Sequence, residues 1–351
     1  MIDLRRLPGF VGALALLSCA QGAPVTEHVS HRLVVDTVAA ADQGLFFRPA
    51  DMVLTPSGQL AVLEYTPSSI VVVEPSTGAL VRRIGDPGKG PGQLITPLGL
   101  ELVGDTLVTL NVGNGRIERF LTDGKSLGSS PAPEGMALGR VALNPDGGIL
   151  APTAGADSTL LRVLTPSGAF AFAVGEPRAP FNREYDLGVF RQLAAQSKVP
   201  DYYANDVLAA MSPDSLFWLA FASVPEIAAY GRDGKRKVVV RLQDSAAAPI
   251  LDDYRRRNRE ESQPPRFHPL LYFADIHVVG NMVWALVRNP PEVDARVIVA
   301  DASGRVVADL VFAGAKDVWR ITPALSDGVI YLSSASSSEI YRASLPKPLH
   351  R

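Results

Sequence analysis

Tyrosines accompanied by arginine, aspartate and histidine gather in two stretches of the chain, at 183–203 and 254–268. A tyrosine offers a large apolar ring and a hydroxyl group, and an adjacent arginine adds a planar cation, so such groups suit recognition of a peptide or glycan surface. An alternative interpretation is that several of these side chains anchor their own loops to the rest of the protein. The candidate ligand-binding residues are Arg183, Tyr185, Asp201, Tyr202, Tyr203, Tyr254, Arg255 and His268.

A run of arginines, Arg255–Arg257 and Arg259, lies in the second stretch. Such a run could act as a clamp for an anion or a carboxylate. It could equally be the solvated face of a helix, because acidic residues flank it at helical spacing. We favour the solvated face, since acids lie on both sides of the run: Asp252, Asp253, Glu260 and Glu261.

Motifs of common catalytic chemistry are missing from the sequence. It contains no Gly-x-Ser-x-Gly, no His-Glu-x-x-His, no phosphate-binding loop and no dinucleotide fingerprint. Of the five histidines, only His268 and His277 lie where a general base could act. His277 falls in a predicted strand, where a role in the core fits at least as well. We therefore predict no catalytic residue.

The secondary structure that must position these residues is indicated by a sequence pattern that recurs six times. Each copy predicts a strand, a tight turn at Gly, Asp or Asn, and a second strand. The copies begin at residues 51, 99, 141, 207, 276 and 321. A repeat every 40–50 residues or so, with four strands per unit, is typical of a propeller. We predict an all-β fold: a six-bladed β-propeller of four-stranded antiparallel blades, forming a single domain over residues 32–351.

The two ends of the chain predict how the ring closes. The last unit has three strands of its own, at 319–325, 329–333 and 340–344. Residues 32–38 alternate as a strand does and can supply the fourth. Pairing of this N-terminal strand with the last blade would leave no open edge on that blade.

The connections between strands differ greatly in length. Turns within strand pairs are short, whereas the long connections are 85–97, 129–139, 175–205, 243–273 and 288–295. In an antiparallel meander the connections alternate between the two faces of the ring, so all the long ones fall on one face. Because loops carry binding in scaffolds of this kind, this face is the predicted working face. The two longest insertions, 175–205 and 243–273, are expected to contain helices at 186–196 and 249–261.

One region of the sequence resembles a known repeat. Residues 85–97 (Gly-Asp-Pro-Gly-Lys-Gly-Pro-Gly-Gln-Leu-Ile-Thr-Pro), followed by 111–117 and Phe120, resemble the NHL-type repeat of bacterial secreted and lipoprotein-type six-bladed propellers. The other units match it only in their rhythm of strands and turns. The resemblance implies a propeller fold and, for most of its members, a role as a binding scaffold, with a minority of enzymes.

Related propellers of the lactonase and gluconolactonase type hold a divalent metal at the mouth of the central channel, with Glu, Asn and Asp ligands at strand ends. By that resemblance the candidate metal ligands are Glu64, Asn111, Asn205, Asp206 and Asp275. These oxygen donors would suit calcium. The alternative is that they cap strand ends and bond to loop amides. The four other corresponding positions carry Pro152, Ala222, Arg288 and Ser334, which do not fit a metal site, and the arginine argues most directly against it.

Composition and the N-terminus bear on where the protein works. With a formal net charge of −2 over 351 residues, the chain lacks the basic excess of a nucleic-acid binder. Residues 1–22 resemble a secretory signal, with Arg5 and Arg6 before a short apolar run. The sequence Leu16-Leu17-Ser18-Cys19 resembles a lipobox, and Cys19 is the sole cysteine. Cleavage without lipidation and an uncleaved anchor are the alternatives. Residues 23–31 would form a tether.

Together these features predict an exported propeller, lipid-anchored through Cys19, that binds an envelope protein, a peptide or a glycan through its long-loop face. It would need no cofactor and would meet the membrane only through its anchor. The alternative is a calcium-dependent lactonase-like hydrolase. A third possibility is a purely structural part of an envelope assembly.

The lipobox gives a direct prediction. When the full chain is expressed in a bacterium and labelled with palmitate, the wild type should incorporate label and Cys19→Ser should not, because the acyl chain needs this thiol. Label that persists in Cys19→Ser would rule out lipidation at this site.

Overall fold

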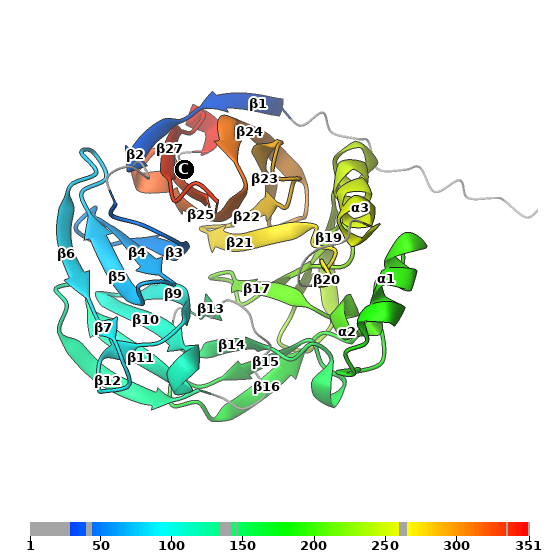
Figure 1. Cartoon of the computed structure of the whole chain (residues 1–351), viewed down its shortest axis with the longest axis horizontal. Helices are drawn as coiled ribbons and strands as arrows, with labels where there is room; N and C mark the ends of the chain where they lie inside the picture. The colour runs from blue at the N-terminus through cyan, green and yellow to red at the C-terminus, as the bar shows by residue number, and fades with distance from the viewer. Residues whose placement is uncertain are drawn as a thin grey trace, which may run out of the picture.

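The computed structural model describes residues 29–39, 44–132, 142–144, 146–259, 265–334 and 336–349. The predicted signal, Cys19, most of the tether, Glu260, Glu261 and much of the 129–139 connection lie outside the described residues. Six sheets of at least four strands surround a common axis (Figure 1). The protein is a six-bladed β-propeller, as the sequence predicts.

Neighbouring strands are consecutive in blades 1, 2 and 3, which follow one another around the ring. Blade 1 contains β3 (Pro49–Leu54), β4 (Leu60–Glu64), β5 (Ser69–Val73) and β6 (Leu80–Ile84). Blade 2 contains β9 (Pro97–Val103), β10 (Thr106–Asn111), β11 (Arg116–Leu121) and β12 (Ser126–Pro131). Blade 3 contains β13 (Ala142–Leu143), β14 (Ile149–Pro152), β15 (Leu161–Leu164) and β16 (Phe170–Val174).

Blades 4 to 6 complete the ring. Blade 4 contains β17 (Val207–Met211), β18 (Phe217–Phe221), β19 (Glu226–Tyr230) and β20 (Arg236–Arg241). Blade 5 contains β21 (Phe273–Val279), β22 (Met282–Val287), β23 (Asp294–Asp301) and β24 (Val306–Lys316). Blade 6 contains β25 (Val318–Ala324), β26 (Val329–Ser334) and β27 (Ile340–Ser344).

The N-terminal segment closes the ring, but it does so as two strands. β2 (Asp36–Ala39) pairs antiparallel with β27 and completes blade 6. The preceding β1 (Val29–Val34) instead runs parallel to β24, as a fifth strand on the outside of blade 5. The predicted single strand at 32–38 is therefore divided between two blades. This division buries Leu33 and Val35 in part against the apolar cluster between blades 5 and 6.

The core consists of the interfaces between blades. Each of the six apolar clusters among the described residues joins two neighbouring blades. Trp218 and Trp284 are the largest side chains that are almost fully buried. The turn before β24 meets blade 4 so closely that a Cβ on Gly304, whose φ is +85°, would lie 2.4 Å from Val238 Cγ1. Both the conformation and the contact therefore require glycine.

The long connections carry the remaining elements. β7 (Asp86–Pro87) and β8 (Gln93–Leu94) form a small parallel pair in the 85–97 connection. Four 3₁₀ turns are described: η2 (Val112–Asn114), η3 (Ala156–Ser158), η4 (Leu325–Asp327) and η5 (Lys347–Leu349). Among the described residues, no helix has the length and apolar character needed to cross a membrane.

Three helices lie in the two longest insertions. α1 (Leu187–Ala195) begins where the sequence predicts, with the Asp186 side chain accepting a hydrogen bond from the Val189 amide at 3.0 Å. α2 (Asp201–Ala204) is a single turn. α3 (Asp244–Arg259) begins five residues earlier than predicted, so Pro249 lies inside it. Ala246, Ala247 and Ile250 are buried in the cluster between blades 4 and 5, and this burial extends the helix toward its N-terminus despite the proline.

The closing strand offers a stability prediction with a matched control. Val38 in β2 is 9% exposed within the cluster between blades 6 and 1, whereas Val34 in β1 is 80% exposed. Val38→Asp should lower the free energy of unfolding by about 3 kcal/mol, because it buries a charge among apolar side chains. Val34→Asp should change it by less than about 0.5 kcal/mol. Urea unfolding followed by tryptophan fluorescence measures both, and equal effects would contradict the assigned closure.

Candidate functional site

Buried polar side chains fasten the long connections to the strand ends beneath them. Asn111, at the end of β10, accepts a hydrogen bond from the Ile95 amide at 2.8 Å and donates one to the Gln93 carbonyl at 2.7 Å. Asn205, just before β17, accepts from the amides of Arg178 and Ala179 at 2.8 and 3.1 Å. Both side chains are almost fully buried. These asparagines therefore fix the shape of the 85–97 and 175–205 connections.

Glu64 performs the same task at the start of blade 1. Its Oε2 accepts hydrogen bonds from the amides of Phe47 and Arg48, at 2.9 and 3.0 Å. Burial raises the pKa of Glu64, although the two backbone hydrogen bonds act in the opposite direction. Its Oε1 is buried and has no hydrogen-bond partner among the described residues. Glu64 therefore holds the segment that leads from the closing strand into blade 1.

Near the axis, two aspartates link the first strands of adjacent blades. Asp275 accepts from the amide of Ile321 in blade 6 at 3.0 Å and lies 3.1 Å from His277 Nε2. Asp51, which the sequence analysis missed, accepts from the amide of Leu100 in blade 2 at 2.8 Å. In the repeated sequence pattern each of these aspartates comes directly before an apolar residue, Met52 or Ile276. This shared position could have identified Asp51 as the counterpart of Asp275. His277 is thus part of a structural network.

Four of the five predicted metal ligands, all except Asp206, bond to backbone. Asn111 and Asn205 use their amide groups on loop backbone, and Asp275 binds backbone amides and His277. Within the described part of the chain, no three His, Cys, Asp or Glu side chains lie close enough together to hold an ion. Calcium needs six to eight converging oxygens. Glu64, Asn111, Asn205 and Asp275 thus bond to backbone, as in the alternative that the sequence left open, and the calcium site itself stays a prediction.

Most of the predicted rim tyrosines pack against one another. The ring of Phe190 in α1 lies 5.1 to 5.8 Å from those of Tyr185, Tyr202 and Tyr203. Burial raises the pKa of Tyr203 to about 12. Tyr254 in α3 is fully buried and donates a hydrogen bond to the Lys198 carbonyl at 2.9 Å. These rings join the two insertions into one unit. Figure 1 shows the helices of this unit beside blade 4.

Some predicted rim residues are exposed to solvent, and others are held by contacts with neighbouring residues. Tyr185 is 54% exposed, and the Arg183 guanidinium lies 5.1 Å from the centre of the Tyr202 ring. Asp201 is exposed in the first turn of α2. His268 is held through its backbone by Asn258, and burial together with nearby arginines lowers its pKa.

The arginine run of α3 is paired within its own helix. Arg255 contacts Asp252 at 2.7 Å, and Asp253 receives Arg256 and Arg257 at 2.5 and 2.7 Å. These pairs are three or four residues apart, as expected of a helix surface. The compensating acids are therefore present, but Asp253 is only 7% exposed and Arg255 also donates to Ser197 Oγ, so part of this face is packed and not solvated.

A groove opens between blades 3 and 4. It consists of two adjoining hollows of about 780 and 530 Å³, which share Ser158, Pro177 and Arg178 in their walls. The larger hollow extends to the turn before β20, and the smaller one continues along the 175–205 insertion to Phe181. Phe181 is 51% exposed. The groove therefore joins the side of the ring to the long-loop face.

Arg178 is the central cation of this groove, and the sequence analysis did not single it out. Its guanidinium lies 4.1 Å from the centre of the Phe221 ring and 2.5 Å from Glu226 Oε1. Glu226 also faces Arg236 at 3.4 Å and Arg241 at 3.7 Å. One carboxylate thus serves three guanidinium groups.

The groove walls also carry acids, and two of these have cations of their own. Asp233 contacts Lys237 at 2.8 Å, and Asp157 forms an ion pair with Arg162. Their charges are therefore largely offset by neighbours outside the walls. The cations in the wall of the larger hollow are Arg178, Lys235 and Arg236, and the remaining acid there is Glu176. Arg241, the third arginine near Glu226, lines the space on the blade 5 side instead.

Comparisons with known proteins show the fold. No protein-family profile and no curated protein sequence matches the chain. A gluconolactonase from Xanthomonas campestris has a TM-score of 0.51 at 12% identity, over 89% of this chain and 89% of its own. A candidate exported protein from Bacteroides fragilis has a TM-score of 0.51 at 11% identity, over 90% and 99%. At such low identity the likeness is one of architecture, and the NHL resemblance remains a prediction.

Asp206, between α2 and β17, makes stability depend on pH. Burial raises its pKa from 3.8 to about 6, although Arg183 acts to lower it. The folded chain therefore binds this proton more tightly than the unfolded chain, so the aspartate destabilises the fold increasingly as the pH rises from about 4 to about 6, and by a constant amount above that. Asp206→Asn should be more stable than wild type at pH 7.5, by on the order of 2 kcal/mol, and this gain should vanish near pH 4.

The measurement is urea unfolding of both proteins from pH 4 to 8. The exposed Asp201→Asn is the control, for which we expect no comparable gain at pH 7.5. A gain for Asp206→Asn that does not change with pH would show that proton binding is not its cause.

Proposed function

We propose that this protein is an exported binding propeller that holds an extended acidic segment of a protein partner in the groove between blades 3 and 4. The observation that carries the proposal is the pair of groove arginines, Arg178 and Arg236, which share the single carboxylate of Glu226. Export rests on the signal-like N-terminus. The calcium-dependent hydrolase is not our proposal, because four of its five expected ligands are engaged with backbone.

The shape of the groove favours an extended ligand. Its two hollows adjoin at Pro177 and Arg178, so that a chain could pass from the side of the ring to the long-loop face. Arg178 is held against Phe221 and Glu226, and this restraint reduces the entropy lost when its guanidinium binds a carboxylate. Phe181 offers an exposed ring at the far end for an apolar side chain. The site therefore suits acidic residues followed by an apolar one.

The test is a selection from a displayed library of random peptides. The wild-type protein is the bait, and Arg178→Ala is used for counter-selection. The enriched peptides should be rich in Asp and Glu and should carry an aromatic or aliphatic residue. In fluorescence anisotropy, Arg178→Ala should weaken binding about tenfold, a change of about 1.4 kcal/mol.

Arg83→Ala is the matched control, because Arg83 is an exposed arginine on β6 of blade 1. It should bind the enriched peptides as the wild type does. Equal loss in both variants, or enrichment without acidic residues, would overturn the proposal. Binding of a heparin hexasaccharide that depends on Arg178, in the absence of any peptide binding, would assign the groove to an acidic glycan instead.

A further inference from the structure

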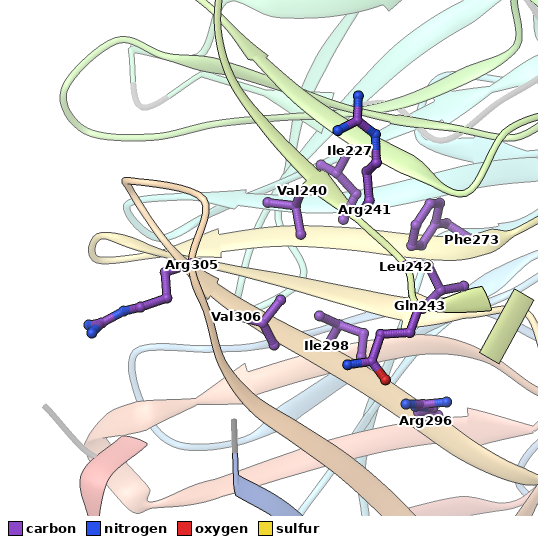
Figure 2. Close-up of a pocket in the computed structure, with 10 residues that line it drawn as sticks. All are labelled: Ile227, Val240, Arg241, Leu242, Gln243, Phe273, Arg296, Ile298, Arg305 and Val306. Carbon is purple, nitrogen blue, oxygen red and sulfur yellow. The ribbon is translucent and has the colours of Figure 1, made fainter. Parts of the chain in front are cut away.

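A second cavity, separate from the groove, lies between blades 4 and 5. It has a volume of about 230 Å³ and is lined by ten residues (Figure 2). Ile227, Val240 and Leu242 come from blade 4 and the segment after it, and Phe273, Ile298 and Val306 come from blade 5. Five of these six apolar side chains are less than 9% exposed. The cavity is thus a gap in the apolar interface between the two blades.

The contact at Gly304 shows that blades 4 and 5 meet closely at the turn between β23 and β24. There, the turn before β24 rests against Val238 of β20. The gap begins next to this contact, at Arg305 and Val306, and ends at Gln243 and Phe273, where α3 and β21 begin.

The remaining lining residues are polar, and none of the ten is acidic. Arg241 and Arg305 are 75% and 59% exposed, and in Figure 2 their side chains extend away from the apolar walls. Arg296 is only 20% exposed, and both it and Gln243 lie toward one end of the cavity in that view. The cavity therefore has apolar walls and one polar end.

Arg296 is positioned so that part of its guanidinium remains for a ligand. Asp309 accepts hydrogen bonds from Nε, at 2.8 Å, and from Nη2. No acceptor for Nη1 is found among the described residues. The ion pair with Asp309 fixes the orientation of the planar group, as Arg–carboxylate pairs do. Nη1 of Arg296 and the side-chain amide of Gln243 can then donate hydrogen bonds to a carboxylate.

We propose that this cavity binds a small monocarboxylic acid with a branched apolar tail. Its tail would lie among Val240, Ile298 and Val306, and its carboxylate would face Arg296 and Gln243. The small volume of the cavity, about 230 Å³, limits the ligand to a short tail. The lack of acids in the wall and the nearby arginines select against cationic ligands, and the apolar wall selects against sugars.

The experiment measures binding of 4-methylpentanoate and of the matched alcohol 4-methylpentan-1-ol by ligand-observed NMR. The acid should bind at least tenfold more tightly than the alcohol. Val306→Phe, which fills the cavity, should abolish binding of both. Val81→Phe, the same change at a site 38% exposed on β6, should leave binding unchanged.

Arg296→Lys tests the polar end without leaving Asp309 unpaired, because lysine keeps the charge but loses the planar fork. Arg296→Lys should weaken binding of the acid at least fivefold and leave binding of the alcohol unaffected, whereas Arg305→Lys should change the affinity for neither. Equal affinity for acid and alcohol, or full binding by Val306→Phe, would overturn the proposal. Because Arg178 does not line this cavity, Arg178→Ala should bind the acid normally, so the two proposals can fail separately.

Discussion

The burial of each blade between two neighbours is the constraint on which the rest of this structure depends. A four-stranded sheet has two faces, and here both are covered by the sheets on either side, so the apolar clusters all lie between blades. Such an arrangement has no exposed apolar face only when the ring is complete. This explains why the N-terminal segment crosses to the last blade and why β2 is as necessary as any strand of the meander.

A second consequence concerns the long connections. Because the blades fill the interior, each connection crosses the long-loop face over strand ends whose polar groups would otherwise be buried without partners. Glu64, Asn111 and Asn205 satisfy these groups in the same way: each is a buried side chain that forms hydrogen bonds with the backbone of the passing segment. The residue types that suit a metal site also suit this task. What separates the two roles is whether their oxygen atoms accept hydrogen bonds from backbone amides, as here, or converge on one point.

The interfaces between blades are also where open space remains. The groove between blades 3 and 4 and the cavity between blades 4 and 5 both flank blade 4, which is followed and preceded by the two long insertions. Glu226 in β19 and the arginines around it link the two regions, since Arg178 and Arg236 face the groove and Arg241 lines the cavity. A propeller can thus hold different ligands at its sides without altering the ring itself.

The sequence by itself determined the number of blades, the strand order and the face that carries the long loops. These follow from the period of the repeat and from short turns, both local properties of the chain. It also located α1 through its Asp186 cap. It did not determine the split of residues 29–39 between two blades, the start of α3 at Asp244, or the roles of Arg178 and Arg296. Those depend on contacts between residues far apart in the chain. Whether a polar side chain meets loop backbone, a carboxylate or open space is decided only when neighbouring blades pack together.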